Sequence, residues 1–329
     1  MKNRIIIFTI FLGFFSCLNS AFAVPEKKEM RGIWISDPRG FNWEKVISDM
    51  KKCGLNNIFV NFASAGATFY PSNILPYREP KDDFAHLIEL AHKNNIYVHA
   101  KILAFFMHWA SKDQITKMKK EGRLLLNTKG KIQIQSQTPW LDPSQIKNRS
   151  QLISIIDEIM SKYDVDGIQL DYVRFYEELN VPESILAIRK SILTNFVAEV
   201  GTKIKTKNKN LRYSACIFYD ETRAREEMAQ DWKKWVDLNI FHFYVPMNYT
   251  VSNTNLVRWI NRQEHITGGQ GNFYSGLAAY MEGMTPKKLI KQISLLRKTM
   301  NPGFILFSYT DEFSKNFIPE LSQFLNSNN

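Results

Sequence analysis

Strand-like and helix-like segments alternate along almost the whole chain, and this alternation restricts the fold more than any other feature. Eight short runs rich in β-branched and aromatic residues are separated by segments whose apolar residues recur at three- and four-residue spacing. Repeated β–α units imply a parallel sheet, and eight of them without a dinucleotide-type glycine-rich first turn favour closure into a barrel. We therefore predict an α/β fold, a single (β/α)8 TIM barrel, with strands at Gly32–Ser36, Asn57–Phe62, Tyr97–Leu103, Gly167–Tyr172, Arg212–Phe218, Phe241–Met247, Tyr274–Ala279 and Phe304–Tyr309.

The segments between these strands predict helices and one long insertion. The insertion follows the third strand, from Ala104 to Pro143, and should fold over the mouth of the barrel because loops after strands lie on the catalytic face. A lysine-rich run from Lys203 to Lys209 is expected to be a solvated loop before the fifth strand. Clear helical periodicity is present at Trp43–Cys53, Phe84–Lys93, Arg149–Tyr163 and Pro182–Lys203.

The N-terminus predicts export. Lys2 and Arg4 precede an apolar run from Ile5 to Phe15, and Ala21-Phe22-Ala23 follows a short polar break. This order of charge, apolar stretch and small-x-small triplet is typical of a secretory signal peptide cleaved after Ala23. The expected organisation is a signal peptide over residues 1–23 and one barrel over residues 24–329, in the periplasm or secreted. Acylation at Cys17, which would make the protein a lipoprotein, is the competing interpretation.

The net charge restricts the classes of binding partner but does not identify a particular one. Removing residues 1–23 takes away two of 43 basic residues and none of 32 acidic ones, which leaves 41 minus 32, or +9. A positive protein suits an anionic environment, so peripheral association with cell wall or membrane is expected. The lysines are otherwise scattered and match no nucleic-acid-binding motif, so no nucleic acid is expected. Cys53 and Cys216 make no metal site by themselves, and neither a metal nor another cofactor is expected.

The fourth predicted strand carries the strongest chemical signal. It runs through Gly167-Ile168-Gln169-Leu170 and closes on Asp171, which places that carboxylate at the catalytic mouth of a barrel. Gln169 shares its inward parity, and Arg174 follows closely enough to orient or ionise it. Asp171 is therefore the candidate catalytic carboxylate, the alternative being a structural pair with Arg174.

Several motifs together carry a resemblance to a known family. They are Met30-Arg31-Gly32-Ile33-Trp34, Ala91-His92-Lys93 through Val98-His99-Ala100, Trp140-Leu141-Asp142-Pro143-Ser144, Asp166-Gly167-Ile168-Gln169-Leu170-Asp171-Tyr172 and Val245-Pro246-Met247-Asn248-Tyr249. The chain resembles the bacterial glycosyl-hydrolase-like family of (β/α)8 barrels that includes glycosidases of denuded, peptide-free peptidoglycan. It is also similar to exopolysaccharide-hydrolase-like barrels that share an Asp-Tyr-x-Arg-Phe ending. The resemblance implies a barrel, hydrolysis of glycosidic bonds and no required metal.

Two segments depart from that family pattern. After the second strand, the usual Arg and Asp are missing from the segment Asn61 to Ser72. After the third strand, Lys101 and Leu103 stand at the usual Trp and Asn positions. These departures imply a substrate that differs from the family norm, or loss of activity.

Glycoside hydrolysis normally needs a second carboxyl group across the scissile bond. Glu221 and Asp220 follow the neighbouring fifth strand directly, so either can approach Asp171, and Glu221 is the first choice. On a substrate with a 2-acetamido group, that group could replace the protein nucleophile and leave Asp171 as orienter. Other acids expected near the mouth are Asp37, Glu282, Asp311 and Glu312.

The remaining polar and aromatic residues near strand ends are candidates for binding sugar. Aromatic rings could stack on sugar faces, while amides and an ammonium group bond hydroxyls. The candidates are Asn61, His99, Lys101, Trp140, Tyr172, Arg174, Asn248 and Tyr249. The function expected is hydrolysis of an envelope polysaccharide, denuded peptidoglycan strands first, by carboxylate acid/base catalysis. The alternatives are hydrolysis of an aminosugar exopolysaccharide and a non-catalytic glycan-binding barrel.

Overall fold

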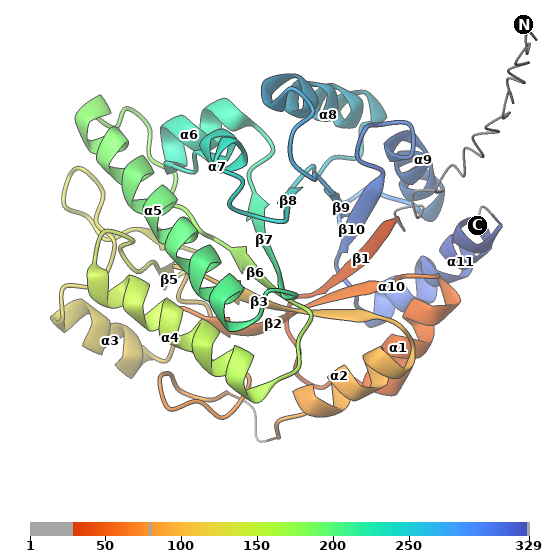
Figure 1. Cartoon of the computed structure of the whole chain (residues 1–329), viewed down its shortest axis with the longest axis horizontal. Coiled ribbons are helices and arrows are strands. Elements are labelled where there is room, and N and C mark those ends of the chain that lie inside the picture. The colour runs from red at the N-terminus through yellow and green to blue at the C-terminus, as the bar shows by residue number, and fades with distance from the viewer. Residues whose placement is uncertain (1–28, 79–80, 328–329) are drawn as a thin grey trace, which may run out of the picture.

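The computed structural model describes residues 29–78 and 81–327, and eight parallel strands form its centre (Figure 1). The predicted signal peptide and Cys17 lie outside the described residues. Each predicted strand is present, with ends shifted by a few residues, so the predicted α/β barrel is confirmed. The strands are β1 (Met30–Ile35), β2 (Asn57–Ser64), β3 (Tyr97–Leu103), β6 (Gly167–Asp171), β7 (Arg212–Ile217), β8 (Phe243–Pro246), β9 (Ser275–Ala278) and β10 (Gly303–Phe307).

The sheet is a nearly closed barrel. Its strand order is β8-β7-β6-β3-β2-β1-β10-β9. Apart from β4 and β5 of the insertion, each strand therefore lies beside the strands before and after it in the chain, and β1 pairs with β10. The two end strands meet through isolated parallel bridges, Tyr244 with Phe273 and Met247 with Gly276. The Tyr274 amide also donates to the Tyr244 carbonyl at 3.0 Å. The carboxyl ends of all eight strands therefore surround one mouth.

Helices form a ring outside the strands (Figure 1). Several begin at a side-chain cap that accepts from a backbone N–H of the first turn, as Asn42 does for α1 and Ser252 for α8. The helices of the ring are α1 (Trp43–Lys52), α2 (Phe84–Lys93), α4 (Ile146–Lys162), α5 (Glu183–Lys207), α6 (Glu221–Met228), α7 (Trp232–Asp237), α8 (Asn253–Thr267), α9 (Pro286–Leu296), α10 (Asp311–Asn316) and α11 (Ile318–Asn326).

Helix α5 is longer than predicted. Its buried face continues through Val200 and Ile204, four residues apart, so the helical register persists to Lys207. The expectation of a loop from Lys203 was therefore wrong, because apolar periodicity outweighed the lysine-rich composition. None of the described helices is long and apolar enough to cross a membrane.

The insertion after β3 has its own secondary structure. It contains α3 (Lys112–Lys120) and a two-stranded antiparallel pair, β4 (Ile134–Gln135) and β5 (Thr138–Pro139). The Ala65 amide donates to the Phe106 carbonyl after β2, and Thr128 donates to Glu178 after β6. The insertion thus packs against loops on the mouth side of the strands that flank β3.

Candidate functional site

Asp171 ends β6 at the mouth and is held from two directions. Its Oδ1 accepts from the Tyr172 backbone N–H at 2.8 Å, and its Oδ2 lies 2.8 Å from the Lys101 ammonium. Lys101 lies opposite Gln169 in the β3–β6 register, so its long side chain extends along the barrel to meet the next inward residue, Asp171. The pair is buried, with Asp171 7% exposed and Lys101 3%. Lys101, and not Arg174 as expected, is the cation that pairs with Asp171.

Aromatic rings surround the Lys101 ammonium. It lies 5.9 Å from the ring centroid of Trp34 and 5.8 Å from that of Phe307, within range of a cation–π attraction. Burial by itself lowers the pKa of Lys101, but the Asp171 carboxylate opposes it, and the net pKa lies above the ordinary value. Lys101 therefore stays charged, and the pair is a true ion pair.

An aromatic wall, defined as Trp34, Tyr249, Tyr280 and Phe307, continues from this pair toward solvent. Phe307 packs edge-on to Trp34 at 5.8 Å and to Tyr280 at 5.5 Å, and Tyr249 lies 5.7 Å from Phe307. Burial raises the pKa of Tyr249 well above its ordinary value, with further contributions from Cys216 and Asp171. Tyr249 thus lies close enough to Asp171 for the carboxylate charge to act on the tyrosine hydroxyl group. Tyr280 is 63% exposed, so the wall ends on an accessible ring.

Trp140 comes from the insertion and lies behind the mouth. It is fully enclosed, at 0% exposed, and packs on Tyr172 at 5.3 Å between ring centroids. The Arg174 guanidinium lies 4.8 Å from the Trp140 ring centroid and 5.3 Å from that of Tyr172. Trp140 therefore supports Tyr172 and Arg174, both half-buried, and has no face of its own open to a sugar.

The other predicted binding residues are engaged within the protein. The Asn248 amide donates to Ser275 Oγ at 3.0 Å, and its carbonyl oxygen accepts from Gln263 at 2.9 Å. Asn61 donates to the Ser36 carbonyl, and its own buried carbonyl oxygen has no partner in the part of the chain that the structure describes. His99 is fully enclosed between β2 and β6, where Nε2 lies 2.9 Å from Asn57 Oδ1. Of these three, Asn61 and His99 each keep a buried acceptor without a partner among the described residues, the Asn61 carbonyl oxygen and His99 Nδ1.

The two favoured partners for Asp171 sit at the start of α6. Asp220 is the N-cap residue and accepts from the Arg223 backbone N–H at 3.1 Å. Glu221 is buried and pairs with Arg225 at 2.8 Å, one helical turn onward. Each carboxylate thus has a local structural role. Among the described residues, the partners of the Asp171 carboxylate are the Lys101 ammonium and the Tyr172 backbone N–H.

The remaining mouth acids also have simple local environments. Asp37 pairs with Arg39 in the loop after β1, and Asp311 and Glu312 occupy the first turn of α10. Glu282 is exposed in the loop after β9. Within residues 29–78 and 81–327, no group of three His, Cys, Asp or Glu side chains is placed to hold a metal ion. Cys53 and Cys216 are both buried free thiols.

Sequence reasoning missed most of the aromatic wall. Tyr280 lies two residues beyond the end of β9 and Phe307 ends β10, so both occupy the strand-end region that identified Asp171. Trp34 lies on β1 and donates through Nε1 to Gln169 Oε1 at 2.7 Å. Applying the strand-end rule to aromatic residues as well as acids would have found Tyr280 and Phe307.

Comparison with known proteins agrees with this architecture. Residues 29–183 match the family model Glycosyl hydrolase-like 10. The chain is 21% identical to glycosyl hydrolase DigH of Escherichia coli K12 over 306 residues, 70% of this chain and 67% of DigH. It is 22% identical to glycosyl hydrolase YngK of Bacillus subtilis over 169 residues, 44% of this chain and 33% of YngK.

Solved structures share the fold at low sequence identity. α-L-Fucosidase isoenzyme 2 of Paenibacillus thiaminolyticus superposes with a TM-score of 0.66 at 13% identity, covering 90% of this chain and 49% of the fucosidase. An α-amylase of Lactobacillus plantarum gives 0.57 at 14% identity, covering 91% and 79%. At such identities these two likenesses show the barrel alone. The match of residues 29–183 to the Glycosyl hydrolase-like 10 model and the likeness to named glycosyl hydrolases confirm the predicted resemblance and support a glycoside hydrolase.

Proposed function

We propose that this protein hydrolyses peptide-free peptidoglycan strands, with Asp171 as the key catalytic carboxylate. The observation that carries the proposal is the buried Asp171–Lys101 ion pair, 2.8 Å long, at the end of a barrel strand and beside an aromatic wall. Catalytic residues of this fold sit at the carboxyl ends of strands. A carboxylate paired with an ammonium is suited to act in its ionised form, as nucleophile or as base.

The aromatic wall supports a sugar polymer as the ligand. A sugar ring has faces of C–H groups, and an aromatic ring such as that of Tyr280 offers these faces an apolar contact surface. Tyr249 and Phe307 extend the same surface inward toward Asp171. A glycan lying along the wall would therefore bring a glycosidic bond close to the carboxylate.

The second carboxyl group is proposed to be Glu221 or Asp220. Glu221 is preferred because Asp220 already serves as the N-cap of α6. A substrate with a 2-acetamido group, such as a wall aminosugar, could supply its own nucleophile, and Asp171 would then orient that group. Neither route calls for a cofactor.

The proposed location rests on sequence features. The predicted signal peptide would export the protein to the periplasm or the medium, where wall glycan is present. The charge of +9 that remains without residues 1–23 would favour peripheral association with an anionic wall or membrane surface. Intact strands are expected to be cut poorly, because their stem peptides would approach the insertion that packs beside the mouth.

A non-catalytic glycan-binding barrel is the second candidate function. It is favoured by the local engagement of both preferred acids, since Glu221 pairs with Arg225 and Asp220 caps α6. An aminosugar exopolysaccharide is the alternative substrate for an active enzyme. It is favoured by Asn61 and Lys101, which stand where the family pattern differs.

One panel of substrates tests these alternatives together. The mature protein and an Asp171→Asn variant would be incubated with intact peptidoglycan, denuded strands and aminosugar exopolysaccharides, and products measured by mass spectrometry. The proposal predicts fragments from denuded strands with the wild type alone. Fragments only from an exopolysaccharide would overturn the wall assignment and keep the glycosidase. Binding of glycan without any product would establish the binding barrel.

A further inference from the structure

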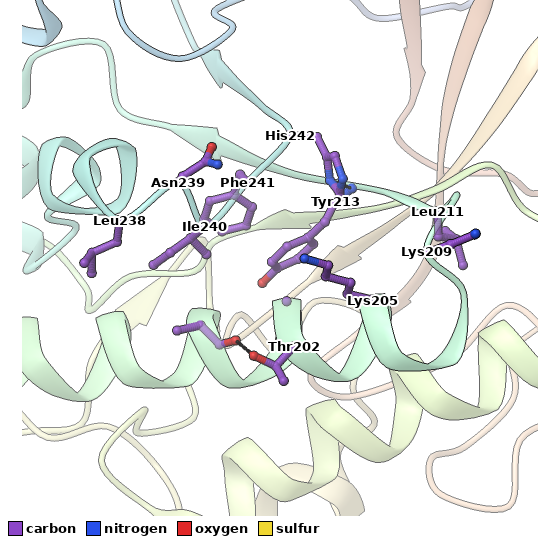
Figure 2. A pocket seen from close by; sticks show the side chains of 12 residues that line it. Thr202, Lys205, Lys209, Leu211, Tyr213, Leu238, Asn239, Ile240, Phe241 and His242 are labelled. Carbon is purple, nitrogen blue, oxygen red and sulfur yellow. Dashed lines mark hydrogen bonds between the residues drawn. The ribbon is translucent and has the colours of Figure 1, made fainter.

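Figure 2 shows a separate hollow of about 350 Å³. It lies at the opposite end of the barrel from Asp171. It is bounded by the last turns of α5, the start of β7 and the segment that joins α7 to β8. These are amino-terminal ends of strands, whereas Asp171 ends β6 at the other side. Its volume lies in the range of small-molecule sites, about 300–1,000 Å³. The hollow is therefore distinct from the proposed catalytic mouth.

The shape of the hollow depends on a glycine inside a helix. Gly201 lies within the 25-residue helix α5, where glycine costs about 1 kcal/mol relative to alanine. A Cβ there would lie 3.3 Å from the Tyr213 ring, closer than ordinary contact. The buried rings of Tyr213 and Phe241 close the floor, and Leu238, 51% exposed, forms an apolar edge.

The polar groups of the hollow are cationic or neutral. None of its twelve lining residues is acidic, and two of them are Lys205 and Lys209. No hydrogen bond or ion pair engages either ammonium group among the described residues. Figure 2 shows Lys205 extending beneath the Tyr213 ring, with His242 above and Lys209 at one end. The hollow thus has unpaired positive charge beside an apolar edge.

His242 adds a neutral donor to this arrangement. Its Nδ1 accepts from the Tyr213 backbone N–H at 2.9 Å, so a neutral ring carries its proton on Nε2. Burial lowers the pKa of His242, and the positive charges of Arg212 and Lys205 lower it further. The ring therefore remains a neutral hydrogen-bond donor at pH 7, in a positive field that an anion would compensate.

We propose that this hollow is a second ligand site that binds a phosphate group carried on a sugar-sized or glycerol-sized moiety. Lysine ammonium groups act as mobile point charges suited to phosphate oxygens. Lys205 and Lys209 contact the phosphate, His242 Nε2 donates to it, and the carbon skeleton packs on Leu238 and Ile240. The phosphate belongs to a soluble sugar phosphate or to a phospholipid headgroup, which share this chemistry.

The alternative explanation is that these lysines serve the fold alone. A cation in the last turn of a helix interacts favourably with the helix dipole, and Lys205 lies in the last turn of α5. Lys209 lies beyond that helix and has no such role. A dipole role predicts a change in melting temperature and no ligand, which separates the two explanations.

The test measures binding of glucose 6-phosphate, glucose and inorganic phosphate to the mature protein by calorimetry, and of phosphatidylglycerol vesicles by co-sedimentation. Lys205→Glu/Lys209→Glu is compared with Lys287→Glu/Lys291→Glu, which makes the same charge change on exposed positions of α9. Leu238→Glu, at an exposed position, places a negative charge on the edge without touching α5. Melting temperatures show that each variant is folded.

We expect saturable binding of a phosphate-bearing probe, weakened about tenfold or more by Lys205→Glu/Lys209→Glu and by Leu238→Glu. The α9 variant should bind within about twofold of wild type. Such binding of free glucose 6-phosphate would assign a soluble ligand, and binding of vesicles alone with the same dependence would assign a headgroup. Equal weakening in the α5 and α9 double variants, or no saturable binding to any probe, would overturn the site.

Discussion

Two adjacent layers of the barrel interior are built from the same strands yet differ in charge. The deep layer consists of Asn57, His99 and Gly167, and the mouth layer contains the Lys101–Asp171 pair two to four residues farther along. In the deep layer, His99 stacks on Phe59 at 4.3 Å and lies beside Asn57. Burial and then the Arg212 charge lower the pKa of His99 to about 3, so the ring is neutral.

The mouth layer shows the opposite arrangement. Lys101 keeps its charge because the Asp171 carboxylate lies 2.8 Å from its ammonium group. Gly167 belongs only to the deep layer, where a Cβ would lie 2.3 Å from His99 Nδ1. The comparison teaches that polar residues deep in this barrel serve packing, whereas a charge is retained only where the strands reach the mouth.

The largest effect is expected from Asp171→Asn, which should lower turnover by on the order of a thousandfold or more. From sequence alone, this change is expected to leave folding nearly unchanged. The ion pair alters that expectation, because the change leaves Lys101 buried without a counter-charge, at a cost of about 3–5 kcal/mol. Steady-state kinetics and denaturant unfolding measure the two effects.

The double variant Asp171→Asn/Lys101→Met separates catalysis from stability. Removing the ammonium should recover most of the unfolding free energy while turnover stays low. Wild-type-like turnover in either variant would remove Asp171 from the mechanism. Recovered stability together with recovered turnover would show that the pair only supports the fold.

His99 should instead contribute a pH dependence to stability. The unfolded histidine binds a proton near pH 6.5, but the native one does so only near pH 3. Between these values the unfolded state binds more protons, so the unfolding free energy falls as pH falls, by about 1.4 kcal/mol per unit. Urea unfolding from pH 7 to pH 4 measures the slope. In His99→Gln this contribution should vanish, and an unchanged slope would contradict the buried neutral ring.

Much of the fold follows from local pattern. The strands could be predicted from β-branched and aromatic runs of the correct length alone. Both ends of α2 were predicted correctly because Phe84–Lys93 has clear helical spacing. The end of α5 was missed because composition near Lys203–Lys209 suggested a loop while Val200 and Ile204 continued the buried face. Burial by distant residues decided that boundary, and local composition does not contain this information.

The candidate site was only partly accessible from sequence. Strand parity placed Asp171 inward and Lys101 was a candidate for binding sugar, but the sequence could not show that a lysine opposite Gln169 extends to Asp171. Trp140 was expected at the mouth and proves to be enclosed behind Tyr172, because the fold of the insertion depends on contacts far apart in sequence. Pairings set by side-chain length and loop packing require the structure.

The second carboxylate can be sought by comparing two neighbouring acids. Glu221→Gln should lower turnover by about a hundredfold if Glu221 assists the leaving group. Asp220→Asn keeps a side-chain acceptor that caps α6, so its stability and turnover should stay near wild type. Kinetics and thermal unfolding on both variants measure this contrast. If Glu221→Gln kept wild-type turnover and Asp220→Asn were inactive, Asp220 would be the second carboxyl group. If both variants kept wild-type turnover, a route assisted by the acetamido group of the substrate would be favoured.

The smallest expected effect concerns the outer end of the aromatic wall. Tyr280→Ala removes an exposed ring beside Phe307, and aromatic contacts of this kind contribute about 0.5–1.5 kcal/mol, so KM should rise a few-fold to about tenfold. The value of kcat should change less, because Tyr280 lies at the solvent end of the wall, away from the Lys101–Asp171 pair. The matched control is Tyr97→Ala, which removes a ring 53% exposed at the start of β3, at the opposite end of the barrel. Kinetics on a glycan that the wild type degrades would compare the two variants, with melting temperatures alongside. If both variants raise KM equally, or neither does, the wall is not the surface on which the glycan lies, and the mouth layer would bind its substrate through Tyr172 and Arg174 instead.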